Sequence, residues 1–153
     1  MRKLSEALYL VVLTLWVGGL WAIGYLVAPV LFASLGDRQL AGVVAGKLFA
    51  LIGWIGLGGA AYLLGFLLVR WRMAVFTRAV FWLVVVMALL AAVSLFGVQP
   101  LMAQLKADAL PRDVMESVLR DRFVTWHGVS SILYLLQSLL GLWLVVWSGR
   151  GLR

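Results

Sequence analysis

The chain has 153 residues, of which 65% are hydrophobic and 12% are charged. Soluble domains are about half apolar and about a quarter charged, and a globule of this size hides only about two thirds of its surface from water. The composition therefore excludes a soluble enzyme. The sequence has no cysteine, which excludes thiol catalysis, iron–sulfur clusters and cysteine–zinc sites.

Four apolar segments are long enough to cross a bilayer as helices, because a hydrocarbon core of about 30 Å needs about 20 helical residues. They cover residues 8–32, 43–69, 76–98 and 124–148, and their centres carry no charge. The first segment is too long for the apolar region of a signal peptide, so we expect it to be retained. The sequence thus predicts an all-α integral membrane four-helix bundle, a single transmembrane domain over residues 1–153.

The charged residues form two sets on opposite sides of the predicted membrane. Seven basic residues and one acidic residue lie near the termini and the 70–78 connection, whereas six basic and five acidic residues lie in or beside the 33–42 and 99–123 connections. Basic short loops stay in the cytoplasm, so we expect both termini on the cytoplasmic side of a bacterial inner membrane. The net charge of +7 is spread over helix ends, which favours attraction to anionic lipid headgroups over nucleic-acid binding.

The second predicted span carries small residues at helical spacing, which lets a neighbouring helix approach closely. They recur every three or four residues and so share one face: Gly42, Gly46, Ala50, Gly53, Gly56 and Ala60. Two interpretations remain open. The face is either the seam of a homodimer or, as we favour, the contact of a central helix with the first and third spans.

Two prolines mark expected helix boundaries. Pro29 must bend or terminate the first span, because proline lacks the amide hydrogen and clashes with the preceding turn. Pro111 suits the first turn of a helix, and apolar side chains recur every four residues from Met115 to Phe123. We therefore expect residues 99–123 to form an amphipathic outer segment, with a helix that starts near Pro111 and runs into the fourth span.

The fourth predicted span carries the polar side chains that could do chemistry. They follow helical spacing and lie on or beside one face: His127, Ser130, Ser131, Tyr134, Gln137 and Ser138. Polar groups are costly when they face lipid, so this face should point into the bundle or a wet cavity. His127 is then either a structural side chain bonded to a neighbouring helix or a proton carrier or haem ligand. One histidine without cysteine cannot complete a closed metal site within one protomer, so we expect no metal.

Aromatic and basic residues offer a second set of candidates, the wall of a ligand pocket. Trp16, Trp21 and Trp54 are expected near mid-depth, and Pro29 and Lys47 lie nearer the outer side. Core packing is the simpler explanation of the tryptophans, and a lysine at a span end commonly extends its ammonium to the headgroups. The alternative is a pocket for a quinone, a sterol-like molecule or a porphyrin, in which Lys47 belongs to a basic rim.

Three stretches of the chain together resemble the sequence of a known family. They are Trp16-Val17-Gly18-Gly19 followed by Ala28-Pro29-Val30-Leu31-Phe32, then Gly42 to Gly46 with Leu48-Phe49, and Phe123-Val124-Thr125-Trp126-His127-Gly128-Val129-Ser130-Ser131. Together they resemble the transmembrane protein 205-like family of small four-span membrane proteins. Animal members of that family often carry asparagine seven residues after the histidine, where this chain has Tyr134. The resemblance implies a membrane-embedded four-helix unit in a bacterial branch without an assigned activity.

The leading hypothesis is a non-enzymatic membrane scaffold or interaction subunit that recognises lipid or other helices, as a homodimer or with another membrane protein. It predicts colourless protein and altered association in Gly46→Leu. One alternative is a redox subunit that binds haem or a quinone with His127 and Tyr134, which predicts an absorption band that is lost in His127→Ala. The other is a permease for a small solute, with uptake that depends on Ser131 and Tyr134.

Overall fold

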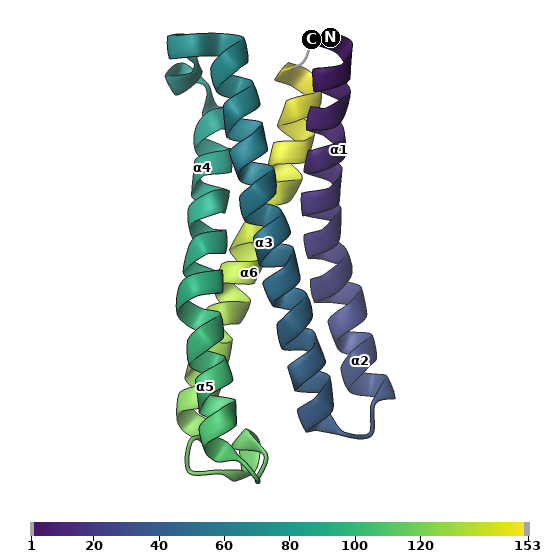
Figure 1. The fold of residues 1–153 in the computed structure, drawn as a ribbon, viewed down its shortest axis with the longest axis vertical. Helices are drawn as coiled ribbons and strands as arrows, with labels where there is room; N and C mark the ends of the chain where they lie inside the picture. The colour runs from purple at the N-terminus through teal and green to yellow at the C-terminus, as the bar shows by residue number, and fades with distance from the viewer. Residues whose placement is uncertain (1, 152–153) are drawn as a thin grey trace.

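The computed structural model of the protein describes residues 2–151 and the side chains of residues 4–148. The chain forms four long antiparallel helical rods (Figure 1). In chain order the rods are α1 (Arg2–Trp21) with η1 (Ala22–Val27) and α2 (Ala28–Ser34); α3 (Arg38–Trp71) with η2 (Arg72–Thr77); α4 (Ala79–Ala92) with η3 (Val93–Val98) and α5 (Gln99–Ala109); and α6 (Arg120–Gly151), which follows the short η4 (Val114–Glu116). All four rods are long and apolar enough to cross a membrane. The all-α four-helix bundle is therefore confirmed, and the described residues include no strand.

The rods stand at the corners of a bundle, because α3 contacts α1 and α4, and α6 contacts the same two helices. One end, here called the terminal end, holds the start of α1, the end of α6 and η2, and the opposite loop end holds the α2–α3 turn and the α5–α6 connection (Figure 1). Of the more basic of the two charge sets, Glu6, Arg70, Arg72 and Arg78 lie at the terminal end. Four other members of this set lie outside the residues whose side chains are described: Arg2, Lys3, Arg150 and Arg153.

Pro29 does not end the first rod, which continues to Ser34. A π-helical segment, η1, ends two residues before Pro29, and a second one, η3, ends two residues before Pro100 in the third rod. A π-turn is wider than an α-turn and moves the carbonyl that the proline ring would otherwise strike. The first rod accordingly bends rather than stops, as the course of α2 away from α1 shows (Figure 1).

Local capping explains where α3 begins. The carboxylate of Asp37 accepts hydrogen bonds from the backbone amides of Gln39 (2.8 Å) and Leu40 (3.1 Å). An aspartate at this position satisfies amides that have no partner within the helix. The short turn before it lets the second rod run back antiparallel to the first.

The prediction of a helix that starts near Pro111 and runs into the fourth span is wrong. Residues 99–109 extend the third rod as α5, and beyond them the chain forms only the single turn η4 before α6 begins at Arg120. The Asp113 carboxylate accepts a hydrogen bond from the Met115 amide (2.9 Å), a local bond that competes with a continuous helix. Val114 is buried, whereas Val118 is 99% exposed.

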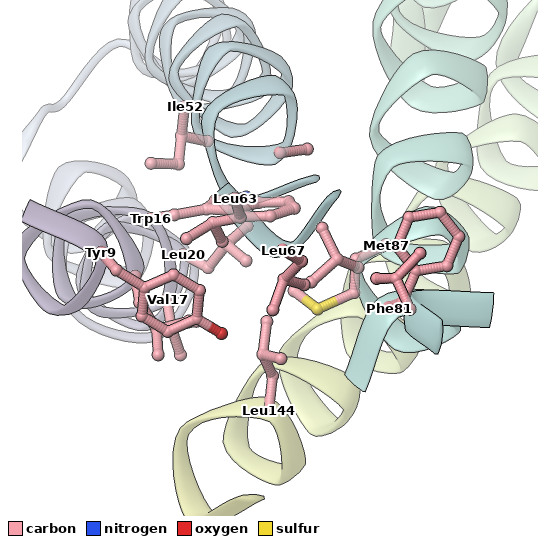
Figure 2. Close-up of a cluster of buried hydrophobic side chains, with 14 residues drawn as sticks. Tyr9, Trp16, Val17, Leu20, Ile52, Leu63, Leu67, Phe81, Met87 and Leu144 are labelled. Atoms are coloured by element: carbon pink, nitrogen blue, oxygen red, sulfur yellow. The ribbon is translucent and has the colours of Figure 1, made fainter. Parts of the chain in front are cut away.

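Apolar side chains from all four rods fill the centre of the bundle (Figure 2). Trp16 of α1, Leu63 of α3, Met87 of α4 and Leu144 of α6 each have 0% of their surface exposed. Close packing of such side chains, together with contacts between small residues, is what holds membrane helices together. Each of the four rods therefore supplies at least one completely buried side chain to the core.

Candidate functional site

The polar side chains of α6 do not share one environment. Gln137 and Ser138 are buried, with 4% and 0% of their surface exposed. His127 and Ser131, which lie nearer the loop end, are exposed, and Ser130 is half-buried. The inward orientation expected for the whole polar face is therefore wrong for His127 and Ser131. Near the loop end α6 packs against α5 and η4, while α2 bends away from the bundle (Figure 1).

Tyr134 lies between the buried and exposed parts of α6 and joins three rods. Its hydroxyl donates a hydrogen bond to the backbone carbonyl of Leu20. Its ring meets Phe49 of α3 edge-on, with the centroids 5.1 Å apart. Gly24 of η1 faces the same ring so closely that a Cβ there would overlap it. Tyr134 therefore fills the position at which the first rod begins to leave α6.

His127 and its neighbours form an exposed polar patch on α6. The imidazole stacks on Phe123, with the centroids 5.8 Å apart and the planes 15° from parallel. The Ser131 hydroxyl donates to the backbone carbonyl of His127 (2.9 Å), so its hydrogen bond stays within its own helix. Gly128 has no neighbouring heavy atom within 4 Å of where a Cβ would be. We call His127, Gly128 and Ser131 the α6 patch.

Side chains from other helices of the same chain pack against three glycines of α3. Gly53 faces Leu95 of η3 at 3.2 Å, measured from an ideal Cβ position. Gly56 and Gly59 both face the indole of Trp16, and a Cβ on Gly56 would come within 2.5 Å of its Nε1. The small-residue face thus receives side chains from both the first and the third rod.

Of the other small residues of α3, some contact neighbouring helices and one lies on the open surface. Ala60 is buried and Ala50 half-buried. Gly42 lies beside Lys106 of α5, whose ammonium donates to the Gly42 carbonyl (3.0 Å). Gly46 is exposed, with nothing within 4 Å of an added Cβ. Of the six residues, Gly46 thus remains open to a contact from outside the chain.

The structure does not gather the three tryptophans around one cavity. Trp16 is completely buried, and its Nε1 has no hydrogen-bond partner. Trp21 is half-buried and donates from Nε1 to the Ser138 carbonyl (3.3 Å). Trp54 points outward, with 58% of its surface exposed, and meets Phe96 edge-on. The other two residues considered as a pocket wall are also exposed: Pro29 and Lys47.

A pocket of about 360 Å³ opens at the terminal end, where the sequence predicted no site. Its walls come from α1, α3, α4 and α6, and both Arg70 and Arg78 line it. The guanidinium carbon of Arg78 lies 4.1 Å from the ring centroid of Trp71, and Arg70 pairs with Glu6 at 3.1 Å. The sequence signal for this pocket is the cluster of arginine and tryptophan in residues 70–78, whose arginines also contribute to the charge difference that predicts the membrane orientation.

A family model described as "Domain of unknown function (DUF4149)" matches residues 11–111. The matched stretch includes most of the first three rods and the small-residue face of α3, and it ends before α6. No curated protein and no solved structure matches the chain.

Proposed function

The chain belongs to the DUF4149 family, a domain of unknown function, and we propose that it is a non-enzymatic interaction subunit of the membrane that binds a further transmembrane helix. The resemblance to the transmembrane protein 205-like family supports the same interpretation, because that family is a membrane-embedded four-helix unit. We also propose that the protein lies in a bacterial inner membrane, with both chain termini in the cytoplasm. The unequal distribution of basic residues between the two ends supports this orientation.

The α6 patch is the observation that carries the proposal. Exposed polar side chains on a membrane helix cost free energy when they face acyl chains, and a small residue lets a second helix approach closely. The α6 patch combines both properties, with the exposed imidazole of His127 beside the open surface of Gly128. Its apolar neighbours Ile132 and Leu135 are 61% and 50% exposed. A helix packed on Gly128 would cover the polar groups and these apolar side chains together.

The redox and permease alternatives have less support from the geometry. His127 lies on the surface against Phe123, whereas Trp16 is buried and Trp21 half-buried, so these side chains do not line one site. A permease needs a polar path, and apolar side chains such as Met87 occupy the centre of the four rods (Figure 2).

Photo-cross-linking in native membranes tests the proposal. A benzophenone amino acid replaces Ser131 in the α6 patch, and a matched control places it at Leu89 of α4, which is 60% exposed. We expect protein adducts from position 131 and lipid adducts from position 89. Lipid adducts alone at position 131 would refute the proposal. Two copies with tags of different size identify the partner, because an adduct that carries both tags contains a second copy of the chain.

Two glycine substitutions distinguish the α6 patch from a seam on α3. A Cβ meets nothing within 4 Å at either Gly128 or Gly46, and both residues are exposed, so a leucine side chain can extend outward at either position, and the amount of folded protein is compared for both variants. We expect Gly128→Leu to remove the protein adducts and Gly46→Leu to keep them. The opposite pattern would assign the partner to α3 and contradict the role of the α6 patch.

A further inference from the structure

We propose that the terminal-end pocket binds the phosphate headgroup of an acidic phospholipid. This binding site goes beyond the proposed interaction function, because it lies at the opposite end of the bundle from the α6 patch and uses different residues. Two arginines, an aromatic wall and a cavity of about 360 Å³ are its components.

Arg70 supplies the first cation. Its side chain is 22% exposed, and its Nη1 pairs with Glu6. A guanidinium has five N–H donors, so this ion pair leaves donors that can reach a phosphate. Planar guanidinium groups bind phosphate oxygens with two parallel hydrogen bonds, which a lysine cannot do. Glu6 therefore orients Arg70 and uses only part of its donor capacity.

Arg78 supplies the second cation and is positioned by Trp71. The guanidinium lies over the indole, 4.1 Å from its centroid. This contact restricts the long side chain before a ligand arrives, which lowers the entropic cost of binding. Arg78 also precedes the first turn of α4, which has no side-chain cap, and Ala79 and Val80 of that turn line the pocket. Amides at a helix start favour an anion, so they add to the attraction of the two arginines.

The rest of the pocket wall is apolar and suits the glycerol and acyl part of a lipid. Phe66, Leu67 and Trp147 line it alongside the charged groups. Trp71 and Trp147 also lie at helix ends, where tryptophan sits at headgroup level in membrane proteins. Basic pockets between transmembrane helices bind anionic headgroups in this position. A ligand with both a phosphate and an apolar tail fits these walls better than a soluble phosphate does.

Native mass spectrometry of the full chain in detergent measures the binding directly. The purified protein is titrated with dioleoylphosphatidylglycerol or with dioleoylphosphatidylcholine, which have the same acyl chains. We expect tighter binding of phosphatidylglycerol and a loss of about tenfold in its affinity in Arg78→Gln, as for one charge-assisted contact. Arg72→Gln is the matched control, because Arg72 and Arg78 are both exposed and lie at the same end, but Arg72 does not line the pocket. It should change the affinity less than about threefold, because a charge outside the pocket acts on the phosphate only through solvent.

Three results would overturn the proposal. They are equal affinity for the two lipids, equal losses in Arg78→Gln and Arg72→Gln, or full displacement of the lipid by millimolar glycerol 3-phosphate, which would assign the pocket to a soluble phosphate ester. Arg78→Lys keeps the test available if Arg78→Gln does not fold. It retains the charge without the planar donors, and an intermediate affinity supports the site, whereas wild-type affinity contradicts it.

Discussion

Replacing Gly56 by alanine should destabilise the bundle, although alanine is the better helix former. The new methyl group would lie 2.5 Å from Nε1 of Trp16 and 3.0 Å from its Cε2, whereas carbon contacts are most favourable at about 3.5–4.0 Å. The indole has 0% of its surface exposed, so it can move only by displacing its own neighbours. Overpacking of this kind costs about 1–3 kcal/mol.

Gly46→Ala is the matched control, because the same methyl group meets nothing within 4 Å there. Both substitutions gain about 1 kcal/mol of helix propensity, so the propensity gain cancels in the comparison. Gly56→Ala should therefore be about 1–3 kcal/mol less stable than Gly46→Ala. The free energy of unfolding of each variant is measured separately by steric trapping in bicelles, under the same conditions.

A double mutant isolates the contact itself. A phenylalanine at position 16 lacks the Nε1 edge that meets residue 56, so Trp16→Phe should cost less in the Gly56→Ala background than in the wild type. We expect a coupling of about 1 kcal/mol or more between the two positions. Additive effects, or equal stability of Gly56→Ala and Gly46→Ala, would refute the steric argument.

Single substitutions test two further contacts and the orientation of the chain in the membrane. Tyr134→Phe loses the hydrogen bond to the Leu20 carbonyl and should lower the free energy of unfolding by about 0.5–1.5 kcal/mol; wild-type stability in the same steric-trapping assay would contradict this. Lys106→Met removes the bond from α5 to the Gly42 carbonyl, so amide hydrogen exchange in α5 should become faster, and an unchanged rate would argue against that tie. Ala74→Cys adds the chain's one cysteine at an exposed position of η2; an impermeant maleimide should label it from the cytoplasmic side, and labelling from the periplasm would reverse the proposed orientation.

The number and approximate position of the rods could be predicted from the sequence, because the length of an apolar stretch is set by the bilayer. The continuation of the first rod through Pro29 could not be predicted. Proline stops an α-helix in water, but a π-helical segment before it accommodates the ring, and the sequence carries no simple signal for such a segment. Pro100 follows the same pattern in the third rod.

The polar face of α6 shows a second limit of periodicity. Helical spacing places His127 and Ser138 on one side of the helix, but it does not say which neighbours lie beside each turn. The neighbours change because α2 bends away, so Ser138 is buried while His127 is exposed. The terminal-end pocket was missed for a related reason, since its walls come from four rods and no spacing along the chain brings them together.

The position of Trp16 against Gly56 has a consequence for biosynthesis. The indole belongs to the first rod and the surface that receives it belongs to the second, so the ribosome has delivered the tryptophan well before its receptor exists. The side chain of Trp16 can therefore reach its final packing only after α3 has entered the membrane. A bulky residue at Gly56 would leave the indole without this packing surface after both helices have been inserted.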